Sequence, residues 1–420
     1  MTTVADRLVP LIGDVLGRPV PFRLRAWDGS TAGPDGAPTV VVRHRRALRR
    51  LLWQPGELGL ADAYITGDLD VEGDLGTALT RIRGALAGQG PVRPAPRDWP
   101  RLLVAAARLG VLGPRPAPPG GRAAVRGEPH SRARDRAVIS HHYDLSNEFY
   151  ELLLGPAMAY SCAYFGSRDT TLADAQTAKF DLVCRKLGLQ PGMRLLDVGC
   201  GWGALAVHAA RHHGVQVTAV TLSARQHAFA TALAAEAGLA DRIDVRLQDY
   251  REPVDGPYDA VSCIEMGEHV GKDGYPAFAA RLFELLRPEG RLLVQQMSRG
   301  SAAPGGGAFI ETYIAPDMHM RPVGESVGLL ESAGLEVRQV EALREHYART
   351  LDAWHRTLQE RREEVVALVG VAVLRLWRLY LVGSAQAFAE RRMGVDQILA
   401  VRPTREGRSG APATPAAWYR

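Results

Sequence analysis

The stretch RLLDVGCGWGALAVHAA (194–210) joins an apolar run, an acidic residue, three alternating glycines and an alanine-rich segment. The apolar run predicts a buried strand over 194–200, and the segment after the glycines predicts a helix. Glycines at such a turn let the backbone pass close to a ligand, and the helix start presents free N–H groups. The stretch therefore predicts a strand–loop–helix unit with a ligand site at its loop.

The sequence around this unit alternates between predicted strands and predicted helices. Four further strands are expected at 215–222, 243–249, 258–266 and 291–297. Such alternation predicts an α/β fold, with a mostly parallel sheet and helices on both faces. Because ligands of these folds bind beyond the carboxyl ends of the strands, Gln295 and Gln296, which end the last strand, are expected near a site.

The acidic residue of the opening stretch narrows the choice of ligand. Nucleotide and dinucleotide folds also use glycine-rich loops, so the glycines alone are weak evidence. Asp197 precedes the first glycine by two positions. A carboxylate there suits the amino group of a methionine-like ligand and would repel a pyrophosphate. No Lys-Ser/Thr pair follows, which excludes a Walker loop.

Composition and segment character divide the 420-residue chain into four predicted parts. Residues 1–86 are expected to form a small α+β domain, 87–136 a Pro- and Arg-rich linker, 137–403 the catalytic domain and 404–420 a disordered tail. No apolar run approaches the roughly 20 residues of a membrane span, and no signal peptide is recognised. The four cysteines show no CxxC spacing, so no metal site is expected. The same observations lead us to expect a cytoplasmic location.

The net charge is +5, and arginine supplies most of the positive charge. Basic residues concentrate at 43–53 and 88–137. Basic surface beside apolar residues suits an anionic membrane, although a solvated surface and an arginine-rich linker explain it equally well. No nucleic-acid motif accompanies it, so nucleic acid is not an expected partner. The helical patch 99–112 is expected to pack, with contact to a membrane as the alternative.

Several motifs in order resemble one group of class I S-adenosylmethionine methyltransferases. HHYDLSNEFYELLLGPAMAYSCAYF (141–165), TLSARQ (221–226), GEHVG (267–271) and HYARTLDAW (346–354) together look like the cyclopropane-fatty-acid and mycolic-acid synthase family. The likeness covers about 137–400, and GELGLADAYITGDLDVEGDL (56–75) resembles the lipid-engaging N-terminal domain of its longer members. It implies a Rossmann-like methyltransferase domain with S-adenosylmethionine as cofactor.

The resemblance carries the family's cofactor contacts onto positions spread over the catalytic domain. The implied contacts are Tyr160, Ser161, Leu195, Leu196, Asp197, Val198, Gly199, Cys200, Gly201, Trp202, Gly203, Thr221, Leu222, Ser223, Gln226, Gln248, Asp249 and Ile264. Taken singly, Ser161, Thr221 and Gln226 are better explained by ordinary turn and helix-cap chemistry. As a set in register with Asp197 they favour a cofactor site.

The reaction of this family methylates a lipid C=C bond and passes through a carbocation. Such a site must align its reactants, exclude water and supply a base for the final proton. In the family that base is understood to be a bicarbonate ion held by Cys, Glu, His, Ile and Tyr positions. The Cys, Glu and Tyr positions correspond to Cys162, Glu268 and Tyr347, and the His and Ile positions fall on Gln295 and Met297.

Two acidic residues and a histidine near GEHVG are the other ionisable candidates. Glu265 and Glu268 lie three residues apart and would share a face on a helical turn. Glu268 is expected to be the base or the anchor of bicarbonate. His269 either orients Glu268 or caps the next helix.

The departure at 295 leaves two outcomes open, because Gln can donate a hydrogen bond but cannot carry charge or a proton. Bicarbonate still binds and a cyclopropane forms, or the cation rearranges by a 1,2-hydride shift and leaves an exocyclic methylene. The second course resembles the methyltransferases of tuberculostearic (10-methyl-branched) acid biosynthesis, which share EMGEHVG and a QQM strand end, and it is the favoured hypothesis. A non-catalytic protein that binds lipid and S-adenosylmethionine is the alternative from a different class.

The favoured reading also implies partners and a location. The expected substrate is an unsaturated, oleoyl-type phospholipid acyl chain at the inner face of the cell membrane, to which the protein would bind peripherally. A flavin-dependent reductase is the expected consumer of a methylene product. A homodimer is the expected assembly, if the chain associates at all.

Overall fold

The computed structural model describes residues 2–86, 99–120, 122, 127–142, 146–252, 255–300 and 305–419. The chain forms two compact units. Unit 1 comprises residues 1–122, 308–313 and 362–386, and unit 2 comprises 123–307, 314–361 and 387–420. The opening glycine loop and every candidate catalytic residue lie in unit 2.

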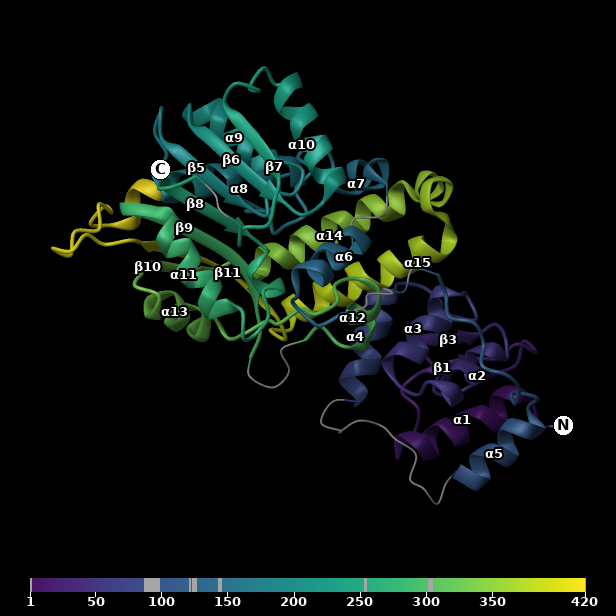
Figure 1. Cartoon of the computed structure of the whole chain (residues 1–420). Coiled ribbons are helices and arrows are strands. Elements are labelled where there is room, and N and C mark those ends of the chain that lie inside the picture. Colours follow the sequence, from purple (N-terminus) through teal and green to yellow (C-terminus); the bar gives the residue numbers. More distant parts are fainter. Residues whose placement is uncertain are drawn as a thin grey trace. The chain divides into compact units, whose positions relative to one another are not determined.

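Unit 2 is built on a seven-stranded sheet with the order β10-β11-β9-β8-β5-β6-β7 (Figure 1). Five strands are mutually parallel, as the sequence predicts: β5 (Arg194–Val198), β6 (Gln216–Thr221), β7 (Ile243–Leu247), β8 (Tyr258–Ile264) and β9 (Leu286–Ser298). The strands β11 (Gly394–Val401) and β10 (Glu336–Ala342) were not predicted. They extend the sheet beyond β9, β11 running antiparallel to β9 and β10 antiparallel to β11.

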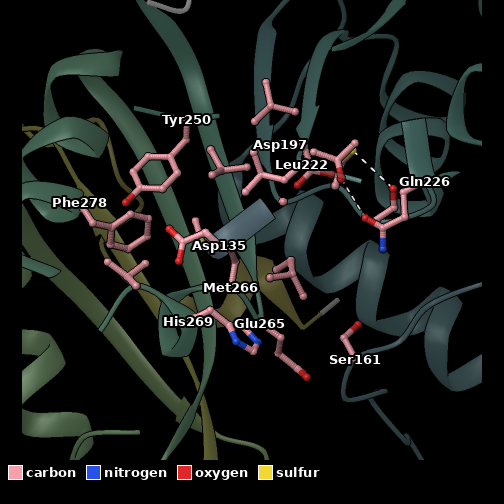
Figure 2. A pocket seen from close by; sticks show the side chains of 18 of the residues that line it. Asp135, Ser161, Asp197, Leu222, Gln226, Tyr250, Glu265, Met266, His269 and Phe278 are labelled. Atoms are coloured by element: carbon pink, nitrogen blue, oxygen red, sulfur yellow. Dashed lines mark hydrogen bonds between the residues drawn. The ribbon is translucent and has the colours of Figure 1, made fainter. Parts of the chain in front are cut away.

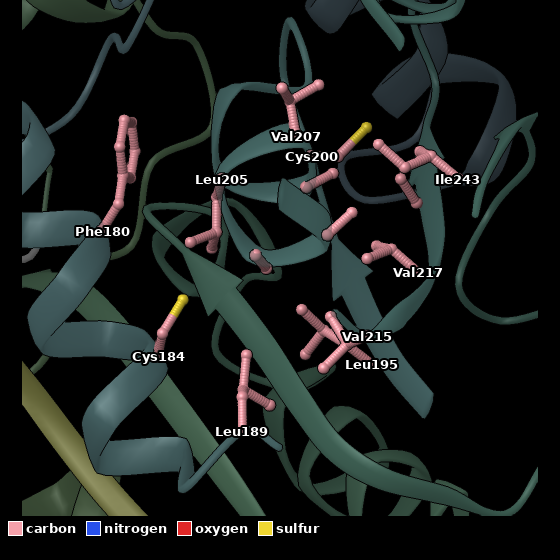
Figure 3. Packing of buried hydrophobic residues seen from close by; sticks show 14 of the residues in the cluster. Phe180, Cys184, Leu189, Leu195, Cys200, Leu205, Val207, Val215, Val217 and Ile243 are labelled. Atoms are coloured by element: carbon pink, nitrogen blue, oxygen red, sulfur yellow. The ribbon is translucent and has the colours of Figure 1, made fainter. Parts of the chain in front are cut away.

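Helices cover both faces of this sheet. Neighbouring residues Leu195 and Leu196 of β5 enter different apolar clusters, as strand alternation requires. The helices α8 (Leu172–Leu187), α9 (Ala204–His213) and α10 (Ala224–Glu236) contribute to the first cluster (Figure 3). The helices α11 (Tyr275–Leu285) and α13 (Val323–Ser332) contribute to the second. The predicted α/β fold with a mostly parallel sheet is confirmed.

The remaining helices of unit 2 lie outside these two clusters. They are α6 (Arg132–His142), α7 (Asn147–Leu154), the 3₁₀ turn η2 (Gly267–His269) and α14 (Arg344–Glu360). Ser146 caps α7 by accepting a hydrogen bond from the Phe149 N–H. Tyr347 of α14 is buried and packs its ring against Phe388, with 4.6 Å between the centroids.

Unit 1 is an α+β unit with a small sheet ordered β2-β1-β3-β4. Its strands are β1 (Arg23–Arg25), β2 (Thr31–Ala32), β3 (Thr39–Val42) and β4 (Leu69–Val71). Its first helices are α1 (Val4–Leu16), α2 (Arg46–Trp53), α3 (Glu57–Ile65) and α4 (Leu75–Leu86), joined later in the chain by α12 (Ala308–Tyr313). Asp62 accepts hydrogen bonds from Tyr313, at 2.6 Å, and from Arg122.

The predicted linker 87–136 is divided between the two units: its described residues 99–120 and 122 belong to unit 1, and 127–136, which include the start of α6, belong to unit 2. Helix α5 (Trp99–Arg108) is followed by a segment that packs on α2. Ala106, Leu109 and Val111 are buried in the core of unit 1. The Arg49 Nε donates to the Val111 carbonyl at 2.8 Å. The packed alternative for 99–112 therefore describes this segment, while 87–98, 121 and 123–126 lie outside the described residues.

Helix α15 (Arg362–Ala389) corrects the expectation that no segment resembles a membrane span. By length and composition it is apolar enough to cross a membrane, and a third of its most apolar window is buried inside the protein. Gly370 has φ +82° and ψ 165°, which kinks the helix. Arg375 donates to the Tyr64 and Leu69 carbonyls, so this part of α15 packs within unit 1.

The C-terminal residues also differ from the disordered tail expected for 404–420. A short 3₁₀ turn, η3 (Pro415–Trp418), ends the described chain, and Trp418 is buried. Its carbonyl accepts a hydrogen bond from Arg185 at 2.8 Å, and Tyr419 donates to Glu341 at 2.7 Å. The segment is polar in composition, but the buried side chain of Trp418 fixes it to the rest of unit 2.

Candidate active site

A cavity of about 610 Å³ opens at the carboxyl ends of β5, β6, β7 and β8. This is the position expected for a ligand in a parallel α/β sheet. Figure 2 shows Asp197, Gln226, Glu265 and His269 among its lining side chains. The predicted cofactor contacts that line it are Tyr160, Ser161, Asp197, Val198, Gly199, Cys200, Gly201, Trp202, Thr221, Leu222, Gln226, Gln248 and Ile264.

Asp197 lies near the end of β5 and is 2% exposed. Its Oδ1 accepts a hydrogen bond from Ser262 Oγ at 2.7 Å. Burial raises the pKa of Asp197 to about 6, against the opposing effects of Ser262 and Lys179. At neutral pH the side chain is therefore a buried carboxylate that borders the cavity, as an ammonium or sulfonium ligand requires.

The glycine loop after β5 has the backbone conformation that its sequence predicts. Gly199, Gly201 and Gly203 have φ values of +77°, +55° and +85°, a region that L-residues with a side chain seldom adopt. A Cβ atom on Gly199 would lie 3.1 Å from the Met266 side chain, and one on Gly203 would lie 2.8 Å from the Cβ of Ala230. The loop therefore depends on glycine for conformation and for space.

Gln226 offers an unused hydrogen-bond donor to the cavity. Its Oε1 accepts from Thr221 Oγ1 at 2.8 Å. Its Nε2 is buried and, within the described part of the chain, has no hydrogen-bond partner. A buried donor without a partner is costly, so a ligand with an acceptor or hydroxyl group is expected there. Together with Asp197 and the glycine loop, this donor fits S-adenosylmethionine.

Five predicted cofactor contacts do not line the cavity. Leu195 and Leu196 are fully buried in the two apolar clusters. Gly203 and Ser223 act at helix starts, where Ser223 Oγ accepts from the Gln226 N–H at 3.2 Å. The Asp249 carboxylate accepts two hydrogen bonds from the Arg251 guanidinium, at 2.8 and 2.6 Å, and one from the Arg251 backbone N–H at 2.9 Å. These residues support the site instead of facing it.

Lys179 of α8 lines the cavity and was not predicted as a site residue. It is 2% exposed, and its Nζ donates to Ser161 Oγ at 2.9 Å. Burial lowers the pKa of Lys179 to about 8, although Glu265, Cys162 and Asp197 oppose the shift. Its position on a helix far from the motifs gave no sequence signal.

The predicted catalytic residues Cys162, Gln295 and Tyr347 meet at Glu265, not at Glu268. Glu265 Oε1 accepts from the Cys162 backbone N–H at 2.7 Å and from Gln295 Nε2 at 2.8 Å. Glu265 Oε2 accepts from the Tyr347 hydroxyl at 2.6 Å. Glu265 has φ +53°, so the residue does not share a helical face with Glu268 as expected.

Glu268 lies in η2 and is fully buried. Its Oε1 accepts a long hydrogen bond, 3.4 Å, from the Met297 N–H, and its Oε2 has no partner among the described residues. Burial and, second, the nearby Glu265 raise the pKa of Glu268 to about 8. Glu268 is thus largely protonated at neutral pH, which argues against its predicted role as the base. His269 lines the cavity, and Met297 is half-buried.

The arrangement does not fit a bicarbonate ion at this point. The hydroxyl of Tyr347 and the amide of Gln295, which were expected to hold it, both donate to Glu265. Burial raises the pKa of the Cys162 thiol well above its usual value, so Cys162 contributes its backbone N–H and not a thiolate. A bicarbonate ion beside Glu265 would be repelled by the carboxylate and would lack the hydrogen bonds that Tyr347 and Gln295 already give to Glu265.

Among the described residues, one group of potential metal ligands occurs outside the lining of this cavity, although no metal was expected. The ligand atoms of Cys184, His208 and His213 lie within 4.8 Å of one another. Burial raises the pKa of the Cys184 thiol, and His208 Nε2 already lies 2.8 Å from Asp181 Oδ1. The Cys184 side chain lies among the apolar residues of Figure 3, so a thiolate ligand is disfavoured.

Comparisons with known proteins agree with this geometry. A family model described as mycolic acid cyclopropane synthetase matches residues 130–398. A protein of Mycobacterium tuberculosis named as a probable fatty acid methyltransferase is 37% identical over 95% of this chain and 95% of its own. Tuberculostearic acid methyltransferase UfaA1 of the same organism is 32% identical over 91% of this chain and 88% of its own. The structure of mycolic acid cyclopropane synthase CmaA1 with SAH and CTAB has a TM-score of 0.60 at 35% identity, covering 63% of this chain and 97% of that one.

The fold and the cavity therefore define a class I S-adenosylmethionine-dependent methyltransferase, which confirms the predicted cofactor and enzyme class. The chain belongs to the mycolic acid cyclopropane synthetase family. Members of this family are named as fatty acid methyltransferases and as cyclopropane synthases.

Proposed function

We propose that this enzyme transfers a methyl group from S-adenosylmethionine to the C=C bond of an unsaturated, oleoyl-type phospholipid acyl chain and releases a 10-methylene product. When bound, the cofactor supplies a sulfonium methyl group. The observation that carries the proposal is the pairing of a neutral Gln295 with the Glu265 carboxylate at the cavity. One relative that aligns over most of both chains is named tuberculostearic acid methyltransferase, and this name supports the same product class.

Aromatic rings beside the site suit a reaction that passes through a carbocation. The rings of Tyr160 and Trp354 lie 5.3 Å apart, and those of Tyr347 and Trp354 lie 6.4 Å apart. Tyr160 itself lines the cavity. Aromatic faces attract positive charge and do not react with it as water would. A cation in such surroundings can live long enough for a 1,2-hydride shift, which precedes loss of the proton in the methylene route.

The product assay tests this proposal. The enzyme is incubated with S-adenosylmethionine and dioleoyl phosphatidylglycerol vesicles, and the methyl esters are identified by gas chromatography and mass spectrometry. We expect a 10-methylene ester, and a cyclopropane ester as sole product would contradict the proposal.

Gln295→His is expected to move the product toward cyclopropane, because His can carry charge and a proton. The exposed Gln190→His is the matched control; unchanged product and rate in Gln295→His would show that position 295 does not control the outcome.

We also propose that the protein works peripherally at the inner face of the cell membrane. Among the described residues, unit 1 carries most of the exposed large apolar side chains, and Arg43, Arg45 and Arg46 are exposed in the same unit. The apolar set is Trp53, Leu60, Trp99, Leu103, Val104, Leu112, Leu368 and Val371. Exposed apolar residues beside arginine are typical of surfaces that bind anionic lipid. A flavin-dependent reductase acting on the methylene product, and a homodimer, belong to the same proposal.

Vesicle binding tests this location. The double variant Leu103→Ser, Val104→Ser is expected to weaken binding to phosphatidylglycerol vesicles about tenfold or more. In the wild-type protein both apolar side chains would become buried in lipid on binding, and serine would not gain this free energy. The wild-type protein should also bind more weakly at high salt. The control is Leu247→Ser in unit 2, which is 54% exposed, against 47% for Leu103. Equal sedimentation of both variants with vesicles would contradict a membrane role for α5.

A further inference from the structure

The Glu265 carboxylate accepts the hydrogen bonds of the main donor groups at the reaction site. Three donors converge on its carboxylate, from the backbone of Cys162 and the side chains of Gln295 and Tyr347. A carboxylate has about four lone-pair positions, so these donors leave one position on Oε2. Glu265 also lines the cavity in which the cofactor fits. Its remaining lone pair is thus available to a proton in that cavity.

The direction of the Gln295 amide is fixed by a chain of side chains behind it. Lys186 can only donate, and its Nζ lies 2.7 Å from Gln397 Oε1. The other end of that amide, Gln397 Nε2, therefore faces Gln295 and donates to its Oε1 at 2.9 Å. Gln295 Nε2 is left to donate to Glu265 at 2.8 Å. The chain thus holds an N–H group, not a carbonyl, against the Glu265 carboxylate.

The backbone of Glu265 shows that its position is maintained against a conformational cost. Its φ of +53° lies in the left-handed region, which is disfavoured for a residue with a long side chain. The Glu265 N–H donates to the Gln295 carbonyl at 2.6 Å, so backbone and side chain are both tied to β9. Strain of this kind persists where the surrounding contacts determine it, often at functional sites.

The electrostatic surroundings make Glu265 a stronger base than a surface carboxylate. Burial raises the pKa of Glu265 above its ordinary value, while the hydrogen bonds from Tyr347, Cys162 and Gln295 limit the shift. Its neighbour Glu268, with a pKa of about 8, is mostly uncharged at neutral pH. Of these two carboxyl groups, Glu265 is the one whose oxygens both accept short hydrogen bonds.

We propose that Glu265 is the general base that takes the last proton of the reaction, in the place where relatives would use an exchangeable anion. This inference rests on the proposed methylation of an acyl double bond. The C=C electron pair forms the new C–CH3 bond, while the S–CH3 pair stays on sulfur and leaves a carbocation on the acyl chain. A 1,2-hydride shift then moves the positive charge onto the methylated carbon. Glu265 accepts a proton from the transferred methyl group, and the C–H pair forms the C=CH2 bond at that carbon. The protonated carboxyl later returns its proton to solvent.

Two substitutions at 265 test the role from opposite sides. Glu265→Gln keeps the shape but cannot accept the proton, and turnover should fall about 100-fold or more, the usual contribution of a general base. Glu265→Gly removes the carboxylate, relieves the left-handed backbone and leaves the donors of Gln295 and Tyr347 facing an open space. Its low activity should rise at least about tenfold on addition of bicarbonate. The matched control is Glu345→Gln, a carboxylate 68% exposed on α14.

The wild-type enzyme should be indifferent to bicarbonate. Rates of S-adenosylhomocysteine formation are compared in carbonate-depleted buffer with and without added bicarbonate. A wild-type enzyme that requires bicarbonate, or a Glu265→Gln variant with the wild-type rate, would overturn the inference. ¹³C NMR of labelled bicarbonate supplies a readout independent of turnover: it should broaden with Glu265→Gly and not with wild type. The reverse pattern would overturn the inference too.

Product identity separates this inference from the proposed function. A wild-type enzyme that makes cyclopropane without bicarbonate, and loses activity in Glu265→Gln, would contradict the methylene product and leave the base assignment intact. A methylene product that depends on bicarbonate would support the proposed function and contradict the assignment of Glu265 as the base.

The side chains that orient Gln295 can be tested at Gln397. Gln397→Leu should lower kcat about tenfold with KM for lipid unchanged and shift the pH profile, because the Gln295 amide loses its orientation. A normal pH profile would remove Gln397 as a positioning residue.

Discussion

Replacing Asp197 by Asn is expected to weaken S-adenosylhomocysteine binding by about 30-fold or more and to abolish detectable turnover. The carboxylate is buried beside Ser262 at the cavity, and the variant keeps its shape while removing the charge. Loss of one partner of a buried charge pair costs about 2–5 kcal/mol. Isothermal titration calorimetry measures the affinity, with the exposed Asp169→Asn as control.

The same carboxylate predicts a pH dependence. Because burial raises the pKa of Asp197 to about 6, lowering the pH through about 6 neutralises it and should weaken cofactor binding. The Asn variant should lack this titration. Equal affinities of wild type and Asp197→Asn at pH 7.5 would show that Asp197 does not contact the cationic part of the cofactor.

Gly203→Val should destabilise unit 2 by about 3 kcal/mol or more and prevent cofactor binding. Gly203 has φ +85°, and a Cβ atom would lie 2.8 Å from Ala230 Cβ of α10. The left-handed backbone costs a β-branched residue about 1–2 kcal/mol, and overpacking typically adds about 1–3 kcal/mol. Urea unfolding measures the loss.

Gly238→Val is the matched control for that substitution. Gly238 also has a left-handed backbone, with φ +67°, but a Cβ atom there would have open space around it. It should show the conformational cost alone and bind cofactor normally. Equal destabilisation of the two variants would mean that the approach of Ala230 contributes nothing.

The parts of the site that depend on local sequence were predictable. The glycine loop and Asp197 arise from a few adjacent residues, so their pattern is visible in the sequence. The five parallel strands followed from the alternation of apolar runs and helices in the same way. These features explain why the fold and the cofactor could be predicted.

The catalytic centre was less predictable because it is assembled from distant segments. Glu265 follows β8, Gln295 ends β9 and Tyr347 lies on α14, and no spacing in the sequence connects them. Gln397 lies on β11, an antiparallel strand that the parallel pattern gave no reason to expect. The sequence could place two glutamates near the cavity, but only the fold shows which one receives the donors.

The most direct test of the account follows two deuterium atoms through the reaction. A phospholipid carrying [9,10-²H₂]oleoyl chains is treated with the enzyme and S-adenosylmethionine, and the product is analysed by NMR and mass spectrometry. The proposed hydride shift followed by proton transfer to Glu265 predicts a 10-methylene chain with both deuterium atoms on C9. A cyclopropane with one deuterium on each of C9 and C10 would contradict the proposed reaction.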